Sequence, residues 1–304
     1  MPIVPEGHVS PRPVKNRLWW PAVGLAALTA VTGCGSQQDP APAAGPVKSS
    51  APATATPGVP ENDPADLLSR ARAAMDAGTG WTFAVTGEES LELTGAPKEQ
   101  GSAASYSATV ERTGSPEALH QSGTVLSKGK RKAEEVFAVD GTGYVRKGAP
   151  GAPWTKGPLT DPEIAAKVED PLAALASFAA YAERDERIEV TTVGGEIRLR
   201  LRIPAAHLAD RTERPAVAKA AREFRPTLDK LRKAGVTAGE ERIVLTGLEE
   251  VLVLDARTHR MASYRSSFGF AVPHEGRQLR YEQELRADTR GSFTGRIEVP
   301  AAAR

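Results

Sequence analysis

The chain has 304 residues, of which 40% are apolar and 25% are charged, as in an ordinary globular protein. Its 39 basic and 38 acidic residues give a formal net charge of +1, so no strong overall field favours nucleic acid as a partner. The length allows one large domain or two small ones, and either can bury a substantial core.

The N-terminal 33 residues have the pattern of an export signal. Arg12, Lys15 and Arg17 form a basic region, Leu18 to Val31 is mostly apolar, and small residues follow. The apolar run is shorter than the roughly 20 residues that span a bilayer. Residues 1–33 are therefore predicted to be a signal peptide and not a transmembrane anchor.

The single cysteine of the chain, Cys34, stands directly after this segment. The sequence Val31-Thr32-Gly33-Cys34 resembles the bacterial lipobox, and this resemblance implies that Cys34 receives a diacylglyceryl thioether and becomes the new N-terminus. The alternative is an ordinary secretory signal with an incidental cysteine. Lipidation is favoured because the only thiol lies where export chemistry requires one. The expected location is extracytoplasmic, lipid-anchored on the outer face of the cytoplasmic membrane.

Residues 34–62 follow as the lipidated cysteine and a stretch rich in Pro, Ala, Ser and Thr. This composition offers too little apolar surface to offset the entropy of ordering, so we predict a disordered tether. Residues 63–304 are predicted to be a single folded domain. Because that domain has no cysteine, its stability must come from packing and not from disulfides.

The predicted domain begins with an amphipathic helix, because Asp63-Pro64 is typical of a helix start and apolar residues recur at helical spacing until Gly78. Alternation of apolar and polar residues then predicts strands. They cover Trp81–Thr94, Tyr106–Val110 and Thr124–Leu126, and a hairpin over 136–145 that turns at Asp140-Gly141.

Helical segments then interrupt the strands. Asp161-Pro162 and Asp170-Pro171 indicate helix starts, and Pro215–Ala234 forms a third helical stretch that Pro226 is expected to kink or divide. Between them, Ile188–Ile203 is a hairpin that turns at Gly194-Gly195. The last predicted strands are 248–254, 262–270, 279–285 and 297–299. Antiparallel strands with helical insertions indicate an α+β protein.

The search for catalytic motifs is negative. The sequence has no G-x-S-x-G elbow, and its five histidines are scattered without metal-ligand spacing. Its carboxylates mostly alternate with Arg and Lys on predicted solvated faces, which favours surface charge over a catalytic pair. We therefore expect no enzyme, no cofactor and no metal.

The densest cluster of basic residues consists of Lys128, Lys130, Arg131 and Lys132. On a tethered protein they could contact anionic lipid head groups. A solvated hairpin turn that protects a strand end is the favoured interpretation.

Large apolar residues would fill the space between the sheet and the helices that cover it. The pattern does not decide whether that space is a solid core or a ligand cavity, and plain core is favoured for any single residue. The ligand-cavity candidates are Trp81, Phe83, Phe137, Leu172, Leu175, Phe178, Phe224 and Leu228.

Short motifs in this order resemble the actinobacterial lipoproteins related to LppX and LprG. The motifs are the lipobox and tether, the run from Val136 to Arg146, Trp154, Asp170-Pro171-Leu172, Arg202-Ile203-Pro204, and the run from Val251 to Asp255. The resemblance implies a fold similar to LolA and LolB: a strongly curved antiparallel sheet, or half-barrel, with helices covering its concave face.

In that family the space between sheet and helices holds acyl chains, and there are no catalytic residues to transfer. The resemblance therefore implies a membrane-anchored protein that binds or carries a lipid or other amphipathic ligand. The alternative is a sensory or interaction module of the same fold, which contacts an envelope protein and binds no small molecule. A solid core together with a large exposed apolar patch would favour this alternative.

Overall fold

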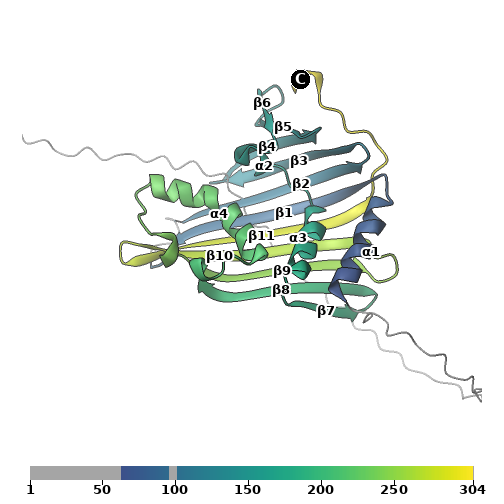
Figure 1. Cartoon of the computed structure of the whole chain (residues 1–304). Helices are drawn as coiled ribbons and strands as arrows, with labels where there is room; N and C mark the ends of the chain where they lie inside the picture. The colour runs from purple at the N-terminus through teal and green to yellow at the C-terminus, as the bar shows by residue number, and fades with distance from the viewer. Residues whose placement is uncertain (1–62, 96–100, 304) are drawn as a thin grey trace, which may run out of the picture.

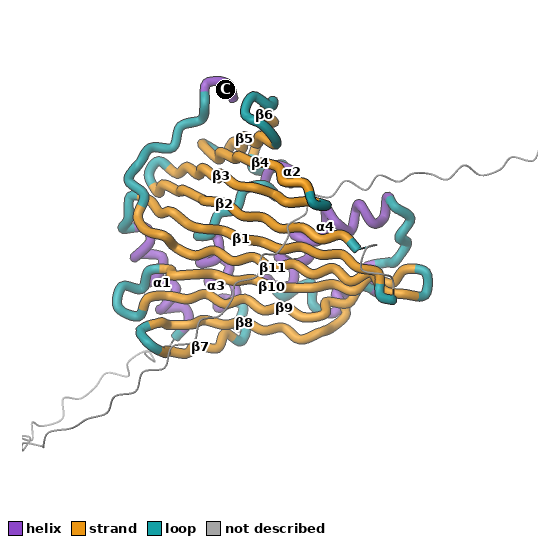
Figure 2. The backbone as a smooth tube through the Cα atoms, turned by 180° about the vertical axis from the view of Figure 1, so that it is seen from behind, coloured by secondary structure: helices purple, strands orange, loops and turns teal. Residues whose placement is uncertain are grey.

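The structure, a computed structural model, describes residues 63–95 and 101–303. The predicted signal peptide, Cys34 and the predicted tether lie outside this part of the chain. The described residues form an α+β fold in which one antiparallel sheet of eleven strands carries helices on one face (Figure 1). Seen from behind, the other face of the sheet carries no α-helix among the described residues (Figure 2). The expected fold class, α+β with an antiparallel sheet, is confirmed.

The sheet consists of two meanders, and its strand order is β6-β5-β4-β3-β2-β1-β11-β10-β9-β8-β7. Only the central pair, β1 with β11, joins strands far apart in the sequence. The sheet is open, with β6 and β7 as its edges. The strands are β1 Gly80–Leu93, β2 Ser102–Gly114, β3 Glu117–Ser127, β4 Lys130–Val139, β5 Thr142–Lys147, β6 Trp154–Pro158, β7 Ile188–Val193, β8 Glu196–His207, β9 Val244–Asp255, β10 Met261–His274 and β11 Arg277–Ser292.

The four α-helices of the described residues lie on the same face of the sheet (Figures 1 and 2). Helices α2 and α3 fill the connection between the two meanders, and α4 is inserted between β8 and β9. The helices are α1 Pro64–Asp76, α2 Pro162–Ala165, α3 Ala173–Glu183 and α4 Pro215–Lys233, with short 3₁₀ turns at Leu208–Asp210, Glu240–Arg242 and Ala301–Ala303.

Most of the predicted elements are confirmed, including the turns at Asp140-Gly141 and Gly194-Gly195, where every one of these four residues has a positive φ. Two expectations are corrected. Of the expected kink or division at Pro226, the division is wrong, because α4 continues through this residue as one helix. Residues 297–299 are not a strand but part of an irregular segment that packs on the cluster around Phe137.

The core lies between the sheet and the helices. On β1, the buried residues Trp81, Phe83 and Val85 alternate with less buried ones, so a single face of this strand points toward α1, α3 and α4. On α4, buried residues recur at helical spacing and pack against the sheet, where Phe224 stacks on Phe270 with ring centroids 4.6 Å apart. This packing fixes the position of α4 over the sheet.

Candidate ligand-binding site

A groove of about 380 Å³ lies between the sheet and the helices. Its floor is formed by β1, β2, β3, β4 and β11, and its walls are the segment 165–169 that follows α2 and the second half of α4. Volumes of this order are typical of small-molecule sites. The side chains that decide its chemistry are Glu89, Tyr106, Gln121, Val125, Glu134, Lys167, Val168, Glu169, Glu223, Pro226, Thr227, Lys230, Gln283 and Leu285.

The floor is polar because charged and amide side chains occupy helix-facing strand positions. Glu89 lies on β1 in register with Gln283 of β11. Each is an even number of residues from a buried residue of its own strand, Val85 on β1 and Tyr281 on β11, so both lie on the helix-facing side of the sheet. Gly87, in register with Tyr106 and Leu285, contributes no side chain. The floor is therefore open between two larger residues.

The wall at 165–169 is held to the sheet by Gln121, a buried residue of β3. Its amide nitrogen donates to the carbonyl oxygen of Lys167 at 3.2 Å, and its amide oxygen accepts from the backbone nitrogen of Glu169 at 3.1 Å. Both hydrogen bonds satisfy backbone groups of a segment that is neither helix nor strand. Gln121 thus fixes the backbone on both sides of Val168.

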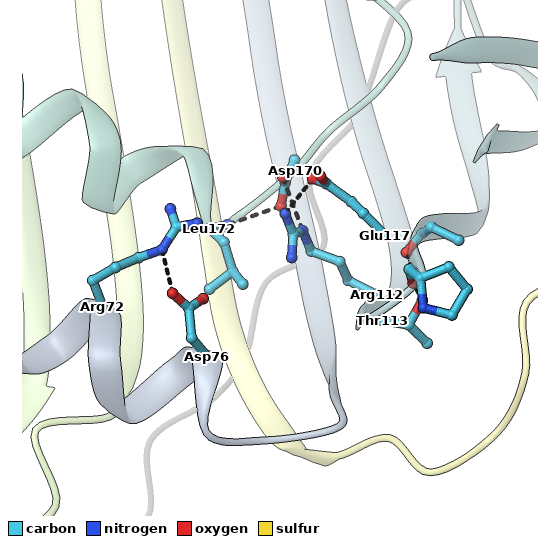
Figure 3. A network of polar contacts seen from close by, with 9 residues as sticks. Arg72, Asp76, Arg112, Thr113, Glu117, Asp170 and Leu172 are labelled. Atoms are coloured by element: carbon cyan, nitrogen blue, oxygen red, sulfur yellow. Dashed lines mark hydrogen bonds and ion pairs between the residues drawn. The ribbon is translucent and has the colours of Figure 1, made fainter. Parts of the chain in front are cut away.

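A second clamp holds the same segment one residue further along (Figure 3). The guanidinium of Arg112 donates to Asp170 at 3.0 Å and pairs with Glu117 at 2.6 Å. Asp170 also accepts from the backbone nitrogen of Leu172 at 3.0 Å, which satisfies a free N–H at the start of α3. The segment that carries Glu169 is therefore anchored at both ends.

Helix α4 supplies the opposite wall with Glu223, Thr227 and Lys230, which follow one another at helical spacing. Two of them also contact the floor. The amide nitrogen of Gln283 donates to Glu223 at 3.2 Å, and the hydroxyl of Thr227 donates to Glu89 at 3.4 Å. The wall and floor thus share polar contacts across the groove.

The groove is acidic. The side chains of four glutamates and two lysines line it on the helix-facing side, and burial raises the pKa of Glu89 and Glu223. Burial, reinforced by the charge of Glu223, raises the pKa of Glu169 to about 7. The structure gives these three carboxylates no ion pair with any described residue, so their charges lack a direct counter-ion.

The hydroxyl of Tyr106 also lacks a partner. Its oxygen is buried and makes no hydrogen bond with the described residues, and burial raises its pKa well above the ordinary value. Tyr106 lines the same groove. A buried hydroxyl without a partner costs free energy, and a polar ligand in the groove could satisfy it.

The predicted cavity residues lie elsewhere. Trp81, Phe83, Leu172, Leu175, Phe178, Phe224 and Leu228 are brought together in one buried core, and none of the eight candidates lines the acidic groove. Leu175 also lines a separate pocket of about 550 Å³ between α1 and α3. The structure therefore places seven of them as packing residues beside the site.

Phe137 does not join the other candidates. It packs in a cluster with Val299 and Ala303, next to Trp154. On β4, Phe137 occupies a position that faces away from the helices. Its neighbour Val136 packs instead against Ile164 of α2. Strand β4 is thus buried on both faces at this point, which explains its unbroken apolar run.

Sequence reasoning missed Glu89, Glu250 and Gln283 as helix-facing residues. Each interrupts an alternating apolar series, for example Gln283 between Tyr281 and Leu285. The sequence signal for such a residue is a polar side chain whose neighbours two positions away on the strand are apolar and buried.

A larger pocket of about 910 Å³ spans six strands, β2, β1, β11, β10, β9 and β8. Five of its six charged lining residues occupy strand positions that alternate with the buried ones and so face away from the helices: Glu88, Arg202, Glu249, Glu282 and Glu284. Within the described ranges, no three His, Cys, Asp or Glu side chains are arranged to hold a metal ion. No described helix is both long and apolar enough to cross a bilayer.

Comparison with known proteins gives no family assignment. No protein-family description and no curated protein matches the sequence. Among solved structures, a β-barrel-like protein of the domain of unknown function DUF1849 from Brucella abortus is 8% identical, with a TM-score of 0.24, over 70% of this chain and 99% of its own. The ywiB protein from Bacillus subtilis is 7% identical, with a TM-score of 0.21, over 69% of this chain and 92% of its own.

Proposed function

We propose that this protein is a lipid-anchored extracytoplasmic binding protein whose ligand, a lipid or another amphipathic molecule, lies in the acidic groove between sheet and helices. In this proposal Cys34 carries the diacylglyceryl anchor, and the sheet is the half-barrel of LppX-like and LolA-like lipoproteins, with the helices over its concave face. The observation that carries the proposal is the groove itself, about 380 Å³ of space beneath α4.

The lining of the groove suits an amphipathic ligand. Val125, Val168, Pro226 and Leu285 offer apolar contact, whereas the carboxylates and Tyr106 offer polar contact. Apolar burial at about 25 cal/mol per Å² would supply much of the affinity, and the polar groups would fix orientation. No catalytic step is proposed.

Native mass spectrometry of the protein purified from its own host tests this proposal. We expect a bound small molecule that extraction with organic solvent releases. The variant Ala166→Trp adds bulk at an exposed position on the rim of the groove and should reduce the bound fraction. The control Ala149→Trp lies in an exposed loop outside the groove and should not. A protein that is empty in repeated preparations would contradict the proposal.

A second candidate function is an interaction module that binds no small molecule. The packed core at the predicted cavity positions is compatible with it, and the 910 Å³ pocket on the face without helices favours it. The acidic residues Glu282 and Glu284 there would suit a basic segment of an envelope protein. Cross-linking in intact cells from position 282 should then capture one dominant protein, and Glu284→Lys should abolish that cross-link. Capture that Glu284→Lys leaves unchanged would contradict this function.

A further inference from the structure

We propose that the ligand of the groove beneath α4 is held through a cationic ammonium group, which Glu169, Glu89 and Glu223 surround. This inference rests on the proposed function, since it names the chemistry of the ligand in the same groove. An ammonium carries three N–H donors on a compact charge, and carboxylates accept such donors in short, strong hydrogen bonds.

The first argument is the charge of the groove. Among the lining side chains on the helix-facing side, four carboxylates stand against two ammonium groups. One of the four is already neutralised, because Glu134 pairs with Lys147 at 3.5 Å. Glu169, Glu89 and Glu223 have no such pair with a described residue and approach the groove from three different parts of the fold.

The second argument is that Glu169 is held in place without a partner for its charge. Gln121 and Arg112 fix the backbone on either side of it through hydrogen bonds to the main chain and to Asp170. Its carboxylate makes no hydrogen bond with any described residue and lines the groove. A rigid segment that presents an unpaired carboxylate to a cavity is preorganised for a cation.

The third argument comes from the hydroxyl of Tyr106, buried in the groove floor without a hydrogen-bond partner among the described residues. Tyr106 lies on β2 in register with Gly87, the open position in the floor between it and Leu285. An aromatic ring beside a cation also gains from the negative face of its π-system. The phenol oxygen of Tyr106 can therefore accept a hydrogen bond from an ammonium or a hydroxyl of the ligand.

An anionic head group fits poorly. Carboxylate or phosphate in the same position would face three unpaired glutamates, and like charges at close range in a partly buried site repel strongly. The lysines of the lining lie among acidic neighbours: the positive charge of Lys230 acts on Glu89, and that of Lys167 on Glu169. The geometry therefore distinguishes cationic from anionic amphiphiles.

Isothermal titration calorimetry of the delipidated protein at pH 8 tests the inference with octylammonium, octanoate and ethylammonium as probes. We expect octylammonium to bind at least about tenfold more tightly than octanoate of equal chain length. Glu169→Gln should weaken octylammonium binding by about tenfold. Glu189→Gln, at an exposed glutamate of β7 that lines neither the groove nor the larger pocket, should leave it unchanged.

The probes also separate the possible sources of the ammonium group. Tighter binding of octylammonium than of ethylammonium assigns the site to an amine-bearing lipid, and equal binding assigns it to a small free amine. Both outcomes support a cation site.

Octanoate that binds as tightly as octylammonium, or octylammonium binding that Glu169→Gln does not change, would overturn the inference. The same holds if neither amine binds. In each case the proposed function survives if protein from the host still carries a molecule that Ala166→Trp displaces, and it fails as well if that protein is empty. A melting temperature for each variant confirms that it is folded.

Discussion

The ammonium of Lys219 on α4 lies 3.0 Å from the carboxylate of Glu250 on β9 and 2.7 Å from the hydroxyl of Tyr264 on β10. The Glu250 side chain is only 2% exposed and also accepts from the hydroxyl of Tyr181 on α3 at 3.2 Å. Burial by itself would lower the pKa of Lys219, but the charges of Glu250, Tyr181 and Glu223 and the hydrogen bond to Glu250 together outweigh it, and the pKa is raised. One ion pair therefore joins two helices to the sheet beside the groove.

Lys219→Met should destabilise the protein strongly, because it leaves the buried Glu250 without its counter-ion. We expect a loss of about 3 to 5 kcal/mol in the free energy of unfolding, measured by urea denaturation. The exposed Lys233→Met on the same helix should change it by less than about 0.5 kcal/mol. The double variant Lys219→Met with Glu250→Gln should lose less than the two single losses combined, and simple additivity would contradict the pairing.

The groove should make the ligand-free protein less stable as pH rises. Burial raises the pKa of Glu169 to about 7, so the folded state holds its proton more tightly than the unfolded state does. The contribution of this pKa difference to the free energy of unfolding is fully present below the unfolded pKa, near 4.5, and is lost as pH rises through about 7. The ionisable groups around Glu169 are Glu223 and Lys219 on α4, Lys167 on its own segment, Glu134 on β4 and Tyr106 on β2.

Glu169→Gln removes the free-energy cost of ionising this buried carboxyl group. It should stabilise the ligand-free protein at pH 8 by on the order of 1 to 3 kcal/mol, less than the whole pKa shift would give, because solvent in the groove screens part of the charge. Thermal unfolding at pH 5 and pH 8 measures it. At pH 5 the variant and the parent should differ little. A variant that is less stable at pH 8 would show that the carboxylate is structural.

Asp170 should be needed to keep the 165–170 wall in place. Asp170→Ala removes the partner of Arg112 and the acceptor for the backbone N–H of Leu172. We expect it to lower the free energy of unfolding by about 1 to 3 kcal/mol. Hydrogen–deuterium exchange should show faster exchange in residues 165–172. Asp66→Ala, which breaks the surface pair with Arg70, is the matched control and should leave that segment protected. Unchanged exchange in the Asp170 variant would contradict the clamp.

Phe137→Ala should destabilise the fold without affecting ligand binding. The ring stacks on His120 at 4.4 Å and packs against Val299 on the face away from the groove. Removing a buried aromatic ring costs roughly 3 to 5 kcal/mol. Calorimetry on the folded variant should give the parent affinity, and a weakened affinity would mean that Phe137 belongs to the ligand site after all.

Cys34→Ala should release the protein from the membrane. The lipobox resemblance implies a thioether at this position, and a diacylglyceryl group is the kind of two-chain anchor that holds a protein stably. Cell fractionation followed by immunoblotting would show the variant in the soluble extracytoplasmic fraction. Retention in the membrane fraction would sink the lipoprotein assignment.

The alternating apolar series predicted most of the strands, since the helix-facing side of β1 is defined by Phe83 and Val85. The same alternation could not predict the central pairing of β1 with β11, because strand order depends on contacts between distant segments. The unbroken run at 136–139 concealed that Phe137 faces away from the helices, under the C-terminal segment.

The candidate site was harder to predict than the fold. The residues expected in a cavity were large and apolar, and the structure packs Phe178 and Phe224 tightly into the core. The groove is formed where polar residues such as Glu89 and Gln283 break the apolar pattern. These positions were visible in the sequence, but their meeting with Glu169 depends on how α4 and the 165–169 segment lie over the sheet.

A crystal structure of the protein purified from its own host, without delipidation, tests the central claim most directly. The account predicts electron density for a bound molecule in the groove beneath α4, with a nitrogen atom within hydrogen-bond distance of Glu169. A groove that holds only water, or density for a ligand lodged between Phe178 and Phe224 in the core, would contradict it.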